Sequence, residues 1–144
     1  MKSYELQIKK IKSSELDSKP VNSSNDAYEF ARNFYSDDIE IYESIFMIVM
    51  NQANNPIGWS KISQGGTCAS TFDVKIMCKI AIDSLAEQVI LVHNHPSGSI
   101  TPSESDIKVT RQAKKALEIL DIRLTDHLIM TKSAYYSFSD NGFL

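Results

Sequence analysis

The sequence is poor in the residues that mark several specialised classes of protein. It has two cysteines, five glycines and four prolines among 144 residues. This composition excludes a disulfide framework, a collagen-like chain and a low-complexity chain. Because Cys68 and Cys78 lack C-x-x-C spacing, we expect small buried side chains rather than a disulfide or a metal site.

Long apolar runs are also missing. No window approaches the roughly 18 consecutive apolar residues that a membrane-spanning helix requires, and the opening MKSYELQIKKIKSS carries charges throughout. The sequence therefore predicts a cytoplasmic protein with no membrane partner. With 42% hydrophobic and 23% charged residues, it is typical of a globular chain that buries one core.

A strong excess of charge of one sign is absent as well. The formal net charge is −3, which gives no general electrostatic case for a nucleic-acid partner. A local case remains because Lys108, Arg111 and Lys115 recur at helical spacing. This pattern is typical of a solvated helix face and is also compatible with a DNA-binding surface.

Periodicity and turn residues predict the organisation of the chain. Residues 1–20 are expected to form an N-terminal arm or an edge strand, and residues 21–144 a single domain. Strands are expected at 44–50, 57–62, 67–72, 87–93, 126–130 and 135–138, and helices at 24–34, 74–81 and 103–120. The first helix is expected to run into the acidic residues 37–40. These elements predict an α/β fold in which helices sandwich a mixed, mostly antiparallel sheet.

The most distinctive chemistry lies in VILVHNHPSGSITPSESD, residues 89–106. Alternate strand residues point to the same side, so His93 and His95 at a strand end project both imidazoles together. A catalytic zinc ion usually takes three protein ligands and keeps a fourth position for water. Asp106 is the nearest further donor, because TPSE (101–104) predicts a capping box that starts a helix just before it.

The pattern is more specific than two neighbouring histidines would be. H-x-H alone is a weak signal, but here P-S-G and then S-x-x-D follow it. The deaminase pattern H-x-E with P-C-x-x-C is absent. His127 is expected to be structural or to support a ligand rather than to bind the metal itself.

HNHPSGSITPSESD resembles the JAMM motif, H-x-H-P followed by S-x-x-D, of the JAB/MPN metalloprotease fold. The RadC-type branch fits best, because Glu43 precedes SIFMIVMN, a strand leads into VILVHNHPSG, and LTDHLIM and YYSFSDNGFL follow. The resemblance covers about residues 21–144. Longer members of this branch also carry an N-terminal helix-hairpin-helix segment, for which we find no match in this sequence.

The resemblance implies that His93, His95 and Asp106 bind one Zn²⁺ ion, with water as the fourth ligand. Glu43 stands in the position of the family glutamate and would act as the general base. Ser103 matches the family serine, whose hydroxyl would face the oxyanion formed on the attacked carbonyl. The alternatives are that Glu43 is only a surface acid and that Ser103 only caps a helix.

Three functions follow as hypotheses. The first is a zinc-dependent metallohydrolase that cleaves a peptide or isopeptide bond in a peptide or protein substrate. The second is a DNA-repair-associated accessory protein with a non-catalytic metal site, which rests on the basic residues at 108–115. The third is a metal-dependent nuclease, although the sequence offers no second carboxylate cluster for a two-metal site.

Overall fold

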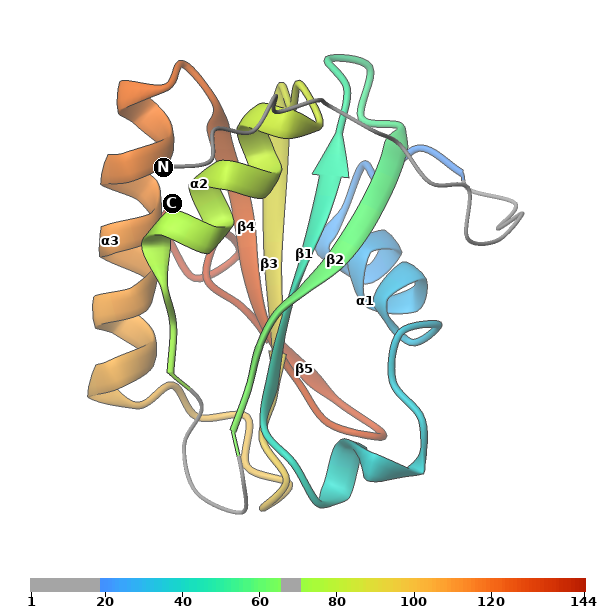
Figure 1. Cartoon of the computed structure of the whole chain (residues 1–144). Coiled ribbons are helices and arrows are strands. Elements are labelled where there is room, and N and C mark those ends of the chain that lie inside the picture. Colours follow the sequence, from blue (N-terminus) through green and yellow to red (C-terminus); the bar gives the residue numbers. More distant parts are fainter. Residues whose placement is uncertain (1–18, 66–70) are drawn as a thin grey trace, which may run out of the picture.

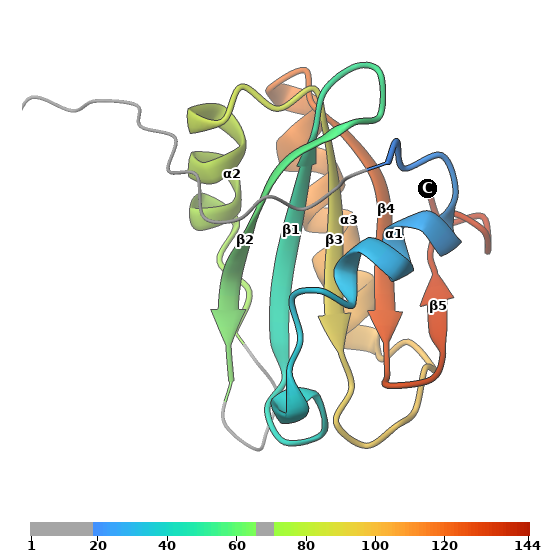
Figure 2. The same cartoon turned by 90° about the vertical axis from the view of Figure 1, so that its right-hand side faces the viewer.

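The computed structural model describes residues 19–65 and 71–144, within which five strands form one mixed sheet in the order β2-β1-β3-β4-β5. The strands are β1 (Ser44–Met50), β2 (Pro56–Gln64), β3 (Gln88–Asn94), β4 (Arg123–Met130) and β5 (Tyr135–Ser137). Only the neighbours β3 and β4 are parallel, and their arrows point the same way in Figure 2. The expected α/β fold with a mostly antiparallel sheet is confirmed.

Helices cover both faces of this sheet. The helices of the described residues are α1 (Ser24–Ala31), α2 (Val74–Asp83) and α3 (Glu104–Ile119), together with the short 3-10 helix η1 (Asp37–Glu40). α2 and α3 pack on one face and α1 on the other (Figure 1). Because both faces are covered, every residue of β1 and β3 is buried.

The alternation of side chains along β1 and β3 divides the core into two layers. Odd-numbered residues such as Met47 and Leu91 pack beneath α2 and α3. Even-numbered residues such as Ile48 and Ile90 pack beneath α1. The same alternation places His93 on the side of α2 and α3 and Asn94 on the side of α1.

The expected helix starts are confirmed at two places. Ser23 caps α1 by accepting a hydrogen bond from the Asp26 amide at 3.1 Å, and Asp73 caps α2 by accepting one from the Lys75 amide at 2.8 Å. Both contacts satisfy amides that have no partner inside the helix.

The expectation for the end of the first helix is wrong. α1 stops at Ala31, and the acidic residues form the separate helix η1. The side-chain amide of Asn33 donates to the Phe30 carbonyl at 2.9 Å, which helps to end the helix. Phe34 therefore lies beyond the helix, where its ring stacks on that of Trp59 at 4.5 Å.

Some expectations fall on other parts of the chain. All but the last two residues of the arm expected at 1–20 lie outside the described residues. Cys68 lies outside them as well. So does most of the strand expected at 67–72, of which the described Thr71 and Phe72 lie in no strand. None of the helices in the described ranges combines the length and apolar composition that crossing a bilayer requires.

A buried carboxylate joins β4 to the end of β5 and to the segment that follows it. Asp126 is 5% exposed and accepts three hydrogen bonds, from the Ser137 hydroxyl at 2.6 Å and from the His127 and Ser139 amides at 2.7 and 3.0 Å. Burial nevertheless raises the pKa of the Asp126 carboxyl, and these hydrogen bonds offset only part of the effect. Asp126 thus stabilises the fold mainly as an acceptor of hydrogen bonds.

Replacement of Asp126 tests this role. Asp126→Ala leaves the buried His127 amide and the part-buried Ser139 amide without an acceptor and should lower the free energy of unfolding by about 2–4 kcal/mol. Asp126→Asn keeps an acceptor for both amides and should cost less than about 1 kcal/mol. Chemical denaturation measures both values.

The same variants carry a pH dependence. Because the pKa of Asp126 is raised in the fold, the native state holds a proton that the unfolded chain releases, and stability falls as the pH rises through that interval. Asp126→Asn should therefore gain stability relative to wild type as the pH rises from acid to neutral. Equal losses for the alanine and asparagine variants at every pH would contradict this role.

Candidate metal centre

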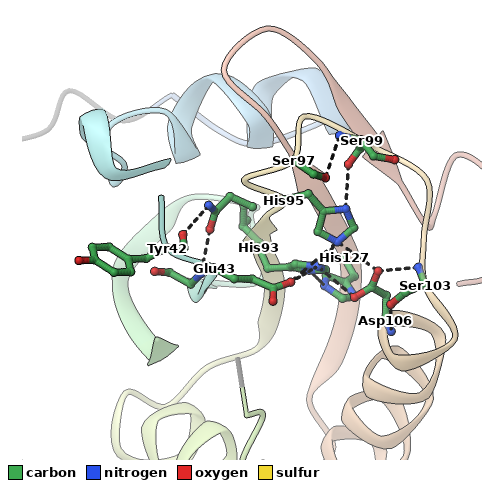
Figure 3. A network of polar contacts seen from close by, with 12 residues as sticks. Tyr42, Glu43, His93, His95, Ser97, Ser99, Ser103, Asp106 and His127 are labelled. Atoms are coloured by element: carbon green, nitrogen blue, oxygen red, sulfur yellow. Dashed lines mark hydrogen bonds and ion pairs between the residues drawn. The ribbon is translucent and has the colours of Figure 1, made fainter. Parts of the chain in front are cut away.

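Three elements bring four polar side chains together at one end of the sheet. His93 lies near the end of β3 and is paired with Ile45 of β1, so Glu43, directly before β1, comes to the same end. His95 follows β3, and its amide donates to the Met130 carbonyl of β4 at 3.2 Å. Asp106 lies in the first turn of α3. Figure 3 shows the four side chains pointing toward one another.

The donor atoms of these side chains are close enough to share one ion. The Nε2 atoms of His93 and His95 are 2.9 Å apart, and they lie 3.1 and 3.3 Å from the Asp106 carboxylate oxygens. One ligand atom from each of the four residues lies within 4.8 Å of every other. Among residues 19–65 and 71–144, this is the one group of three or more such side chains that meets this criterion.

The three closest donors fit a zinc ion in chemistry and spacing. Zinc binds imidazole nitrogen at about 2.0–2.1 Å and carboxylate oxygen at about 2.0–2.2 Å, so tetrahedral neighbours are about 3.3 Å apart. The observed separations of 2.9–3.3 Å between His93, His95 and Asp106 are close to that value. Two neutral nitrogens and one carboxylate form a common donor set for a catalytic zinc ion.

Glu43 stands slightly farther from the other donors. Its Oε1 lies 3.7 Å from Nε2 of His93 and 3.9 Å from Nε2 of His95, and its side chain is 18% exposed. The carboxylate therefore faces the same space as the three closer donors but keeps access to solvent.

The start of α3 sets the position of Asp106, and it differs from the expected one. The helix begins at Glu104, and the capping box joins Ser103 and Asp106 rather than Thr101 and Glu104. The Ser103 amide donates to Asp106 Oδ2 at 2.7 Å, and the Asp106 amide donates to Ser103 Oγ at 3.1 Å. The carboxylate thus joins in capping the helix while it faces the histidines.

This geometry changes the interpretation of Ser103. The residue is the N-cap of α3, so the capping role that was the alternative for Ser103 is present. Because Ser103 Oγ accepts the hydrogen bond from Asp106, the capping contact does not use its hydroxyl hydrogen. That hydrogen can donate to another group at the edge of the cluster.

Electrostatics keep Asp106 ionised. Burial acts to raise the pKa of its carboxyl, but the hydrogen bonds that His93 and His95 donate when their rings are protonated outweigh burial and hold that pKa well below its usual range. The hydrogen bond to Asp106 in turn raises the pKa of His95, and burial opposes that shift. An anionic ligand beside two imidazoles is the charge arrangement that a divalent cation prefers.

Hydrogen bonds behind the cluster determine which nitrogen of each histidine carries a proton. Nδ1 of His95 lies 2.8 Å from the Ser99 carbonyl, which can only accept. Nδ1 must therefore donate, and when the ring is neutral the lone pair of Nε2 faces the cluster. A backbone carbonyl behind a ligating imidazole is a usual way to fix its tautomer.

A longer chain of contacts does the same for His93. The Thr110 hydroxyl donates to the Asp106 carbonyl at 2.7 Å, so it can only accept from His127 Nδ1, also at 2.7 Å. His127 Nε2 is then an acceptor for His93 Nδ1 at 2.9 Å. When the His93 ring is neutral, this order of donors leaves the lone pair of Nε2 facing the cluster.

His127 is well suited to this task because it is fully buried. It has no exposed surface, and its ring stacks on Phe138 with centroids 4.9 Å apart. Burial holds the pKa of His127 well below its ordinary value, so the ring is neutral with one donor and one acceptor. The expectation that His127 supports a ligand agrees with its contact to His93.

Sequence reasoning missed the part that Thr110 plays. Thr110 is 2% exposed on the buried side of α3, one turn after Asp106. A threonine at i+4 from a carboxylate on a helix is the available signal, because both side chains must share one face. The basic residues Lys108, Arg111 and Lys115 instead lie on the exposed outer surface of α3, where they line a shallow hollow.

Comparison with known proteins places the chain in one family. Residues 21–143 match a family model described as the RadC-like JAB domain. A UPF0758 protein of Flavobacterium johnsoniae is 36% identical over 124 residues, which make up 86% of this chain and 53% of that protein. A UPF0758 protein of Porphyromonas gingivalis is 38% identical over 125 residues, or 86% of this chain and 54% of that protein. The chain thus spans about half the length of the curated relatives it matches.

Thr110→Val tests the hydrogen-bond order behind His93. Valine has nearly the same shape but cannot accept from His127 Nδ1, so His127 should move its proton to Nε2 and donate to His93. His93 Nε2 then carries a proton where a lone pair is needed, and zinc affinity should fall by roughly 10–100-fold. Competition with a chromogenic chelator measures the affinity.

Two matched variants serve as controls. Thr110→Ser keeps the hydroxyl and should bind zinc like wild type. Thr131→Val removes another buried threonine hydroxyl, which contacts only Ala134 among the described residues, and should also leave zinc affinity unchanged. Wild-type affinity in Thr110→Val would show that the order of donors is not set through Thr110.

Proposed function

The chain belongs to the RadC-like JAB domain family, and on that premise we propose that it is a zinc-dependent hydrolase that cleaves a peptide or isopeptide bond. His93, His95 and Asp106 would hold the ion, and Glu43 would act as the general base. The single observation that carries the proposal is the position of Glu43 Oε1, 3.7 and 3.9 Å from the two ligand nitrogens.

The proposed division of labour follows from the chemistry of the four side chains. A zinc ion held by His93, His95 and Asp106 would supply Lewis-acid chemistry, by which water becomes acidic enough to lose a proton near neutral pH and a substrate carbonyl becomes more electrophilic. Glu43 accepts the proton of the attacking water on its carboxylate and delivers it to the leaving amine. Its partial exposure leaves room for substrate, whereas buried Asp106 stays a ligand.

Ser103 supports the same reaction from the opposite side of the cluster. Its oxygen is engaged by the Asp106 amide, so its hydroxyl hydrogen remains for an oxyanion formed on the attacked carbonyl. We propose this role in addition to the capping role. Both depend on the N-cap position, which places the hydroxyl at the positive end of α3.

Amide hydrolysis is favoured over the other hypotheses by the composition of the cluster. One ion with one facing carboxylate suffices for attack on an amide carbonyl, whereas a two-metal nuclease requires a second carboxylate group. Within the described ranges, the cluster of Glu43, His93, His95 and Asp106 is the one such group. The basic residues lie on the exposed outer surface of α3, whereas Asp106 lies on its buried side, so they add no argument for a nucleic-acid substrate at this cluster.

Glu43→Gln tests the proposed base. Glutamine keeps the shape of the side chain but cannot hold the transferred proton, so kcat should fall by roughly 100–10,000-fold. Bound zinc should stay at one equivalent, because the three ligands are unchanged. Turnover of a panel of fluorogenic peptide and isopeptide substrates gives kcat, and mass spectrometry of the metal gives occupancy.

The neighbouring acid provides the control. Glu40 lies exposed in η1 three residues before Glu43, and Glu40→Gln should leave both zinc content and kcat at wild-type values. Full turnover by Glu43→Gln would move the base to another residue. A wild-type chain that binds no stoichiometric zinc would refute the hydrolase at its first step.

A further inference from the structure

Asn94 is a fully buried amide between the two histidines. It has no exposed surface, and it is the last residue of β3. Its side chain makes three hydrogen bonds, all short. Nδ2 donates to the Ile39 and Tyr42 carbonyls at 2.6 and 2.7 Å, and Oδ1 accepts from the Ser44 amide at 2.8 Å.

These contacts match what a primary amide offers. Asparagine has two hydrogens on Nδ2 and an acceptor oxygen, and here each hydrogen meets a carbonyl while the oxygen meets an amide. Aspartate would place a second oxygen against two carbonyls, and an apolar residue would leave all three backbone groups without a partner. The side chain therefore acts as a specific bracket between β3 and the segment before β1.

The bracket encloses Glu43. The Tyr42 carbonyl and the Ser44 amide are the backbone groups on either side of that residue. The Glu43 carbonyl itself accepts from the Gly65 amide at 2.8 Å. Figure 3 shows Tyr42 and Glu43 side by side, with the Glu43 side chain directed to the histidines. Hydrogen bonds thus hold three successive backbone groups around the proposed base: the Tyr42 carbonyl, the Glu43 carbonyl and the Ser44 amide.

Asn94 also shares its backbone with the proposed ligands. His93 and Asn94 are adjacent in β3, so their side chains leave the strand on opposite sides. One side carries a ligand to the cluster, and the other holds the segment of Glu43. The paired backbone of β1 and β3 ends at Ile45 and His93, and the Asn94 side chain continues the connection one residue further.

From these contacts we infer that Asn94 is a positioning residue, which sets the distance between the Glu43 carboxylate and the metal-binding nitrogens. It touches neither the ion nor the substrate. It fixes the base relative to the ligands because one short stretch of β3 holds both. The expected effect of Asn94 on kcat rests on the proposed function. Its expected effect on the position of the Glu43 carboxylate is independent of that function.

The test uses the zinc-loaded full chain with Asn94→Ala and the milder Asn94→Ser. Crystal structures of wild type and variants give the position of the Glu43 carboxylate relative to His93 Nε2, which is 3.7 Å here. We expect it to be displaced in both variants. Zinc affinity should stay within about threefold of wild type, and kcat should fall roughly 10–100-fold, because a shift of about 1 Å costs that much.

Gln88→Ala is the matched control. Gln88 is another buried side-chain amide of β3, 4% exposed, at the opposite end of the strand. Its Nε2 donates hydrogen bonds to the Asn51 carbonyl and to Oδ1 of Asn54. Its loss should lower stability in chemical denaturation while kcat and the position of Glu43 stay unchanged. A merely structural Asn94 would behave in the same way.

The outcomes separate the two proposals. If wild type binds zinc but turns over no substrate, the proposed function fails, and displacement of Glu43 in the crystals still decides the role of Asn94. An unmoved Glu43 with wild-type kcat would overturn the inference. So would a parallel loss of zinc affinity, which would mean that Asn94 supports the ligands, or a failure of both variants to fold, which would make it a requirement of the fold.

Discussion

Two imidazoles and two carboxylates crowd together at the end of β3, and the fold keeps them in place by hydrogen bonds to their outer atoms. His95 is held by the Ser99 carbonyl, His93 by His127, and Asp106 by the Ser103 amide. For the two histidines, these bonds also decide which ring nitrogen faces the cluster. The rest of the structure depends on this arrangement, because facing lone pairs without such support would repel one another or draw in water.

The topology explains how distant parts of the chain supply that support. β3 and β4 are parallel neighbours joined through α3, so the helix begins at the end of β3, where its first turn carries Asp106. β4 brings His127 beside β3, with Leu91 as its partner in the register. β1 runs antiparallel to β3 and therefore starts at the same end, with Glu43 directly before it. The order of the strands and the connection through α3 thus bring the side chains of the cluster and the supporting His127 to one place.

Much of this could be predicted from the sequence, because the relevant signals are local. Strand alternation correctly puts His93 and His95 together, and S-x-x-D correctly puts Asp106 near a helix start. The exact start was wrong since Thr101–Glu104 and Ser103–Asp106 both form plausible capping boxes. In the Ser103–Asp106 capping box, the Asp106 carboxylate also contacts the histidines. No local sequence pattern shows those contacts.

Other features could not be predicted, because they exist only between elements. Thr110 and His127 belong to α3 and β4, and their contact depends on how the helix packs on the sheet. Asn94 looks like a spacer between two histidines until the segment before β1 lies beside it. The roles of Glu43 and Ser103 remain predictions carried by resemblance and by position.

The most direct measurement is diffraction from crystals of the zinc-soaked chain, collected on both sides of the zinc absorption edge. We expect one strong anomalous peak bounded by Nε2 of His93, Nε2 of His95 and the Asp106 carboxylate, with Glu43 facing the open side. A peak at another place, or none at these three residues at saturating zinc, would contradict a metal centre here.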